Sequence, residues 1–161
     1  MALSSLTTAQ IATLPTSTIA GMSTADLLGL NTQQIAAFTS VGIGAMTTTV
    51  LAVLTSADAA ALSTSGVAGL NSADIVAMLT ASVVALGTAQ LPSLTTAALA
   101  GLSTAELSGT GTGTAAVVGM TTAQIDALTT AQIAALSTAQ IQGLTTAQIN
   151  ALGTADRKSV V

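Results

Sequence analysis

Large apolar residues recur at every eighth position along the chain. The clearest units, MTTAQIDA, LTTAQIAA, LSTAQIQG and LTTAQINA, fill residues 120–151. We number each octad from its large apolar anchor, so that position two is Ser or Thr, position five Gln, position six Ile, and position eight Ala or Gly. The chain is therefore a tandem array of one eight-residue repeat. The anchors are Leu6, Leu14, Met22, Leu30, Phe38, Met46, Leu54, Leu62, Leu70, Met78, Leu86, Leu94 and Leu102, and then, after a break, Met120, Leu128, Leu136, Leu144 and Leu152.

A single long helix does not fit this period. Each helical residue turns the chain by about 100°, so eight residues leave each anchor roughly 80° away from the previous one. The anchors would circle the helix within a few repeats and form no fixed stripe. The period therefore excludes one continuous helix and a simple coiled coil.

Each octad instead carries the signals of a short helix of its own. Ser or Thr at position two, followed three residues later by Gln, is the capping-box pattern, as at Ser137 with Gln140 and at Thr145 with Gln148. Ala, Gln and Leu favour a helix after the cap, and Gly at position eight, as at Gly143, eases the exit. The position-six residue and the next anchor are three apart, so they share one helix face.

One octad cannot hold such a helix in water. Helix nucleation is costly, and burying one Leu and one Ile does not offset the entropy lost on ordering the octad. Stacking on neighbouring octads must supply the rest, as in solenoids. We therefore predict an all-α solenoid or superhelical ribbon of short capped helices, one per eight-residue repeat.

A β-solenoid is the alternative, because positions four, six and eight also alternate as a strand would. Ala and Gln are better helix formers than strand formers, which favours the helical interpretation. Pro92 at position seven requires a bent or shorter helix in its octad, or else the β-solenoid. Pro15 lies at the cap position, where a helix tolerates it.

The repeats predict one domain, a single array over residues 1–155. Its first part, 6–109, is degenerate, a Gly/Thr-rich interruption fills 110–119, and the repeats of 120–155 are nearly perfect. The tail, 156–161, does not follow the repeat. The last six residues, DRKSVV, are similar to the translation of a common sequencing adapter, so we expect the natural protein to continue; a charged terminal cap is the alternative.

Charge and composition narrow the classes of function. Arg157 and Lys158 are the only basic residues, so we predict no binding to nucleic acid, which depends on neutralising phosphates. No stretch approaches the roughly 18 apolar residues of a membrane helix, so we predict no membrane insertion. The absence of Cys removes disulfides and zinc–thiolate sites. The first residues, MALSSLTTAQ, lack the basic start and apolar run of a secretory signal.

Catalysis lacks its usual side chains, because His, Cys and Tyr are absent. The methionines at Met22, Met46, Met78 and Met120 replace Leu at the anchor and are interpreted as core. We predict that the protein is not an enzyme and has no catalytic, cofactor-binding or metal-binding residue and no cofactor. The acids are scattered and are interpreted as solvated surface charges, at Asp26, Asp58, Asp74, Glu106, Asp126 and Asp156.

The Ser/Thr pairs at positions two and three predict the main surface feature, a flat, uncharged array of hydroxyls and methyls. The array could serve only capping and solubility, or it could recognise a regular partner such as ice, a glycan or a copy of the protein itself. In the regular repeats its possible contact residues are Thr121, Thr122, Thr129, Thr130, Thr138, Thr145 and Thr146.

The units LTTAQIAA, LSTAQIQG and LTTAQINA resemble long, low-complexity bacterial repeat proteins labelled haem utilisation or adhesion proteins. The resemblance is loose before residue 110 and close after 119. It implies an extracellular or cell-surface location and an adhesive or scaffold role. A haem function finds no support, because His, Tyr and Cys ligands are absent.

We therefore expect a structural and adhesive repeat segment of a bacterial surface or secreted protein, which presents a regular Thr/Ser/Gln face for multivalent contact. Its expected partners are further copies of itself or a cell-surface or lattice ligand. An ice-binding or lattice-binding protein that uses the Thr rows is the alternative.

Overall fold

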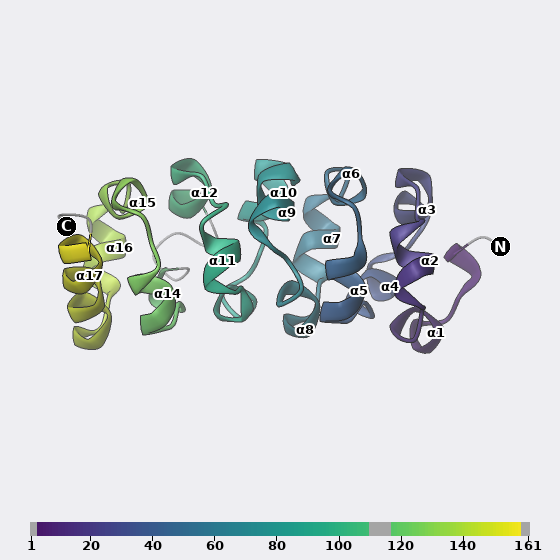
Figure 1. Ribbon diagram of the computed structural model, residues 1–161, viewed down its shortest axis with the longest axis horizontal. Helices are drawn as coiled ribbons and strands as arrows, with labels where there is room; N and C mark the ends of the chain where they lie inside the picture. Colours follow the sequence, from purple (N-terminus) through teal and green to yellow (C-terminus); the bar gives the residue numbers. More distant parts are fainter. Residues whose placement is uncertain (1–2, 110–116, 159–161) are drawn as a thin grey trace.

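The computed structural model describes residues 3–109 and 117–158 and is built from short helices, one in nearly every octad (Figure 1). No strand occurs in these two ranges, so the all-α prediction is confirmed and the β-solenoid is wrong. The helices are η1 (Leu3–Ser5), α1 (Thr8–Ala12), α2 (Thr16–Ala20), α3 (Thr24–Leu28), α4 (Thr32–Ala36), α5 (Ser40–Ala45), α6 (Thr48–Leu51), α7 (Ser56–Ala61), α8 (Thr64–Val67), α9 (Ser72–Ala77), α10 (Thr80–Val84), η2 (Leu91–Ser93), α11 (Thr96–Leu99), α12 (Thr104–Gly109), α14 (Thr122–Asp126), α15 (Thr130–Ala134), α16 (Thr138–Gly143) and α17 (Thr146–Lys158).

The helices start where the capping pattern predicts. At α16 the Ser137 hydroxyl accepts a hydrogen bond from the Gln140 amide N–H at 3.2 Å, and the Gln140 side-chain oxygen accepts one from the Ser137 N–H at 2.8 Å. Thr145 and Gln148 make the same pair of hydrogen bonds. Each pair satisfies two backbone donors that a helix start leaves free. Complete capping boxes also precede α1, α3, α4, α7, α9, α14 and α15.

Two octads depart from the pattern for local reasons. Pro92 has no N–H to give to a helix at position seven, and its octad contains only the short 3₁₀ helix η2, so the shortening predicted from Pro92 is confirmed. The octad that starts at Leu152 has Gly153 at position two, without a hydroxyl to cap a new helix. Helix α17 therefore continues over 13 residues to Lys158.

Helices three octads apart pack against each other, so the chain winds into a rod with three sides. The starts of α1 and α4, at Thr8 and Thr32, are 24 residues apart. We call three consecutive octads a coil, and the two chain ends lie at opposite ends of the rod (Figure 1). The first side holds α1, α4, α7, α10, α12 and α15; the second holds α2, α5, α8, η2 and α16; the third holds α3, α6, α9, α11, α14 and α17.

The stacking continues on both sides of the predicted interruption. Most of 110–119 lies outside the described residues, as do the last three residues of the tail. Helix α11 still packs against α14, and α12 against α15. The helix starts are 26 residues apart here, Thr96 to Thr122, because the interrupted unit is longer than an octad.

The core is a continuous file of aliphatic side chains from positions one and six. An example is Ile125 at position six, which is 0% exposed, with the next anchor Leu128 at 4%. The single aromatic residue, Phe38, is 1% exposed. The core interpretation of the anchor methionines is confirmed, because all four are buried, at Met22, Met46, Met78 and Met120.

Successive coils approach most closely at two glycines in position eight. A Cβ on Gly101 would collide with the backbone carbonyl oxygen of Ser72 in the preceding coil, and a Cβ on Gly69 would collide with that of Ser40. Gly153 is different, because no atom outside its chain neighbours and the backbone of its own helix lies within 4 Å of the place where its Cβ would be.

We expect Gly101→Ala to destabilise the protein by about 1–3 kcal/mol, because the methyl group must push two backbones apart. Gly153→Ala is the matched control. It should stabilise α17 by roughly 0.5–1 kcal/mol, because Ala is the better helix former. Urea unfolding followed by circular dichroism measures both, and equal stability of Gly101→Ala and the wild type would contradict the close approach of the coils.

Candidate functional site

The predicted contact threonines are all exposed, but they fall into two groups with different roles. Position-two residues such as Thr129 cap a helix, and the Thr129 hydroxyl accepts from the Gln132 N–H at 3.2 Å and donates to the Gln132 side-chain oxygen at 3.1 Å. Position-three residues such as Thr130 begin the helix, and their hydroxyls make no hydrogen bond to another described residue. The hydroxyls at position three are therefore the ones left for a partner.

The seven predicted contact residues do not form one flat face. Thr121 and Thr122 lie with Thr145 and Thr146 on the third side, because α14 packs against α17. Thr129 and Thr130 belong to the first side at α15, while Thr138 begins α16 on the second. The prediction of a single flat array from consecutive octads is wrong, because the chain turns to a new side at every octad.

Each side instead carries its own file of position-three hydroxyls, with one residue per coil. Every helix from α1 to α12 and from α14 to α17 begins with Ser or Thr at this position. On the third side the file runs the length of the rod, with its members at Thr24, Thr48, Ser72, Thr96, Thr122 and Thr146.

Apart from the exposed Gln10, the position-five glutamines are not part of the surface. Gln124 is 3% exposed, and its side-chain nitrogen donates to the carbonyl oxygens of Leu94 at 2.7 Å and Leu91 at 2.9 Å in the preceding coil. Its side-chain oxygen accepts from the Thr121 N–H at 2.8 Å. Gln is therefore not part of the predicted Thr/Ser/Gln face, because its side chain caps its own helix and donates hydrogen bonds to the preceding coil.

This bridge, which we call the Gln bridge, recurs along the rod. Gln132 donates to the carbonyl oxygens of Leu102 and Leu99 at 2.8 and 2.9 Å. Ser82 occupies the same position and donates from its hydroxyl to Leu54. The other bridging glutamines are Gln34, Gln90, Gln140 and Gln148. The bridges serve stability, because buried carbonyl groups at helix ends need partners.

The acids at position five are not all solvated. Asp74 is 3% exposed and Glu106 6%, so the interpretation of both as solvated surface charges is wrong. Burial raises the pKa of Asp74, and a hydrogen bond from the Asn71 N–H partly opposes the shift. At Asp26 the Ser23 hydroxyl donates to the carboxylate at 2.6 Å and lowers the pKa of Asp26. Nowhere in the described ranges do three His, Cys, Asp or Glu side chains gather as metal ligands would.

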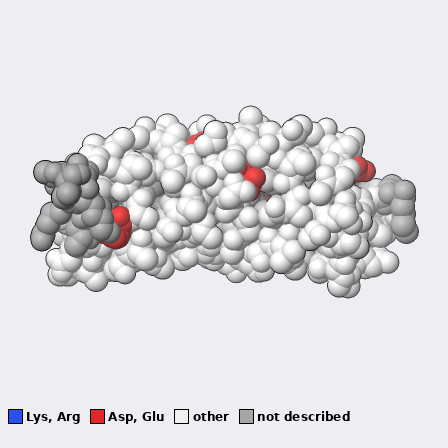
Figure 2. Space-filling view, in the orientation of Figure 1, with Lys and Arg blue, Asp and Glu red and all other residues white. Residues whose placement is uncertain are grey.

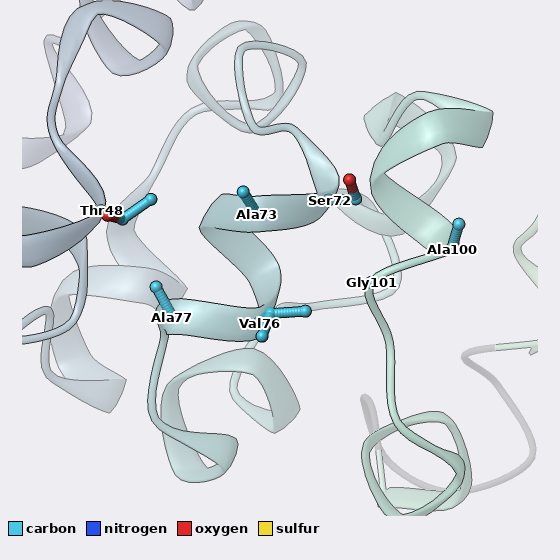
Figure 3. Close-up of a pocket in the computed structure, with 7 residues that line it drawn as sticks. All are labelled: Thr48, Ser72, Ala73, Val76, Ala77, Ala100 and Gly101. Carbon is cyan, nitrogen blue, oxygen red and sulfur yellow. The ribbon is translucent and has the colours of Figure 1, made fainter.

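A shallow groove of about 540 Å³ lies on the third side. Figure 3 shows Ala73 and Val76 of α9 on its floor, between Thr48 and Gly101. Its lining contains no charged side chain, and acids appear only as isolated spots on the face of the rod in Figure 2. The lining residues are Thr48, Ser72, Ala73, Val76, Ala77, Ala100 and Gly101.

The stacked coils define the class of the protein, an α-helical solenoid of octads. The family model described as the ALTTAQ repeat matches residues 19–56, 67–104, 113–138 and 134–156. The chain therefore belongs to the ALTTAQ repeat family. No curated protein and no solved structure matches the chain. Among the described helices, none combines the length and apolarity that crossing a membrane requires.

Replacing one bridging glutamine tests the Gln bridge. Gln124→Glu keeps the acceptor for the Thr121 N–H but loses the donor to Leu91 and Leu94. We expect a loss of about 1–3 kcal/mol at pH 7, because two buried carbonyl groups lose their partner. Part of the loss should return at acid pH, where a protonated Glu can donate.

Gln10→Glu is the matched control for this substitution. Gln10 is exposed and caps Thr7 in the same way, but its side-chain nitrogen makes no hydrogen bond to a described residue. Its replacement should leave the free energy of unfolding nearly unchanged. Urea unfolding at pH 7 and at pH 4 measures both variants, and equal losses at the two positions would refute the bridge as a source of stability.

The opposite pKa shifts of Asp74 and Asp26 predict opposite pH dependences of the free energy of unfolding. Because the folded-state pKa of Asp74 is raised, its contribution favours folding below the unfolded-state pKa and is lost as the pH rises through the folded-state pKa. We expect Asp74→Asn to be more stable than the wild type at pH 7 and to lose that advantage as the pH falls toward about 4, near the ordinary pKa of Asp.

Asp26→Asn should behave in the opposite way. The folded-state pKa of Asp26 is lowered, so its contribution is present above the unfolded-state pKa and is lost as the pH falls. The variant should be less stable than the wild type at pH 7 and approach it in acid. Thermal unfolding from pH 3 to pH 7 measures both differences, and differences of the same sign for the two variants would contradict this assignment.

Proposed function

We propose that the protein is a structural and adhesive repeat segment of a bacterial surface or secreted protein, located outside the cell. The observation that carries the proposal is the file of position-three hydroxyls, exposed or half-buried and without a hydrogen bond to another described residue, that recurs once per coil on the sides of a rod. A regular file of identical groups suits a partner that is itself regular, such as a polysaccharide or another copy of the rod.

The rod suits multivalent contact because its hydroxyls are held at a constant spacing. Packed helices lie about 8–10 Å apart, so successive hydroxyls of one file recur at roughly that interval. Each hydroxyl contact is weak, but several contacts on one rigid body add as avidity. With basic residues only at Arg157 and Lys158, the rod has little charge with which to hold nucleic acid, so we propose a neutral partner.

Removing position-three hydroxyls from the single file of the third side tests this proposal. We expect a variant with Thr→Val at Thr48, Thr96, Thr122 and Thr146, all exposed on that side, to lose binding to an insoluble polysaccharide by about tenfold or more, because avidity multiplies the four small losses. Co-sedimentation with chitin, cellulose and peptidoglycan measures the binding. These residues begin helices but do not cap them, so the fold should survive, which circular dichroism checks.

The matched control replaces the same four residues with Ser, which keeps the hydroxyls and should keep the binding. Equal binding of the Val variant and the wild type, or no binding to any of the three polysaccharides, would overturn the adhesive function through these files. The same proteins are tested for thermal hysteresis. A hysteresis that the Val variant loses would favour the second candidate, an ice-binding protein, for which the continuous hydroxyl file of the third side is the favouring observation.

A further inference from the structure

Position seven on the third side alternates between large and small side chains from one coil to the next. Leu28, at the end of α3, is 59% exposed, and Val76 of α9 is 71% exposed. Ala52 follows α6 and Ala100 follows α11 at the same position of their octads. Because α3, α6, α9 and α11 pack in this order along the rod, the four residues form one row of large, small, large and small side chains.

Half of this row lines the shallow groove of the third side. In Figure 3 Val76 projects from α9, and Ala100 lies at the end of α11, next to Gly101. Apolar surface that gathers in one place is a sign of a contact site, because covering it releases water from the surface. The row therefore offers large side chains for a partner to cover and small positions that a partner's side chains can fill.

The acids of these four octads follow the same alternation. The octads of Leu28 and Val76 each contain one acid, Asp26 and Asp74 respectively, whereas the two octads with Ala at position seven contain no charged residue. A partner that fits the row must place small, uncharged octads against the octads that carry a large side chain and an acid. A second copy of the chain meets this requirement, because its own row contains both kinds of octad at the same spacing.

We propose that two copies of the rod pair side by side through this row, antiparallel and related by a twofold axis between α6 and α9. Leu28 of each copy then lies against Ala100 of the other, and Val76 lies against Ala52. Each octad with an acid faces an octad without charge. Such a contact is isologous and closes as a dimer. Parallel pairing in register would instead place large side chains against large ones and acids against acids.

The pairing uses the part of the third side from α3 to α11. In Figure 1 this side lies along the top of the rod at α3 and α6 and lower at α14 and α17, so it turns gradually around the rod. Two rods paired along it wind around each other, as the helices of a coiled coil do. The dimer covers the position-three hydroxyls of these four helices, so pairing and polysaccharide binding exclude each other there. The pairing does not depend on adhesion, and a variant that cannot pair should bind polysaccharide at least as well as the wild type.

The complete 161-residue protein is used to test the pairing, without polysaccharide. Sedimentation equilibrium over a concentration series should show monomer and dimer and no larger species. Leu28→Gln with Val76→Gln should weaken the dimer by about 100-fold or more, because four large aliphatic side chains are lost from the contact. Gln is natural at this position, as at Gln142, so the fold should be retained. A wild type that stays monomeric, or a double variant that dimerises as strongly as the wild type, overturns the proposal.

Val41→Gln is the matched control, because Val41 is 65% exposed but lies in α5 on the second side. It removes an equally exposed aliphatic side chain from a surface outside the proposed contact, so it should leave the dimer unchanged. A loss of dimer in this variant would assign the contact to another side and overturn the proposal. Circular dichroism of each variant checks that its helices are retained.

Filling the small positions separates this contact from general hydrophobic association. Ala52→Leu with Ala100→Leu adds apolar surface but leaves no room for Leu28 and Val76 of the partner, so this variant should be monomeric. Stronger self-association than in the wild type would overturn the proposal. Mixed with Leu28→Ala and Val76→Ala combined in one chain, whose row is small throughout, it should form a one-to-one dimer. A mixture that stays monomeric would contradict the fit of large to small side chains.

Spin labels on two equivalent residues of the second side determine the orientation. The chain has no Cys, so Ser17→Cys in α2 or Val41→Cys in α5 can each carry a single label outside the contact. In an antiparallel dimer the two copies of residue 17 lie farther apart than the two copies of residue 41, because α2 is one coil farther from the twofold axis. Double electron–electron resonance measures both distances, and equal distances would show parallel pairing and overturn the proposal.

Discussion

The rod depends on the contact between each coil and the one before it. A helix of five or six residues has more free backbone groups at its ends than internal hydrogen bonds. The side chain of Gln in position five provides hydrogen-bond partners for some of these free groups. In Gln132 the oxygen accepts from the start of its own helix and the nitrogen donates to two carbonyl groups of the preceding coil. Capping and stacking are therefore coupled, and neither is complete without the other.

The aliphatic core could not set this register alone. Leu, Ile and Val side chains pack without direction, and cores tolerate exchange among them. A buried amide has fixed donor and acceptor sites, and a coil displaced by one residue would leave its carbonyl groups unpaired. Because the core and the bridges have these separate roles, the degenerate octads can keep the fold without a bridge in every octad. Where position five is small or apolar, as at Gly66, Val50 and Ala98, the residue is buried in the core and makes no bridge.

The same geometry divides the surface from the interior. The position-three residue begins each helix, and its hydroxyl makes no hydrogen bond to another described residue. The position-two hydroxyl, by contrast, caps the helix. Each side of the rod is therefore a file of equivalent groups separated by one coil, with little charge between them. Such a surface favours the proposed adhesive role.

The sequence by itself determined the octad and the position of the capping boxes, because these depend on residues at most eight apart. It favoured the helical form, and the structure excluded the β-solenoid. The pair Ser137 and Gln140 predicted the start of α16, and Pro92 predicted the shortened helix of its octad. The path of the chain was decided only in the tertiary structure. The bridge from Gln124 reaches Leu94, 30 residues away, and the distribution of the seven threonines over three sides follows from three octads per coil. No local pattern encodes that number, because it results from how closely whole helices can pack.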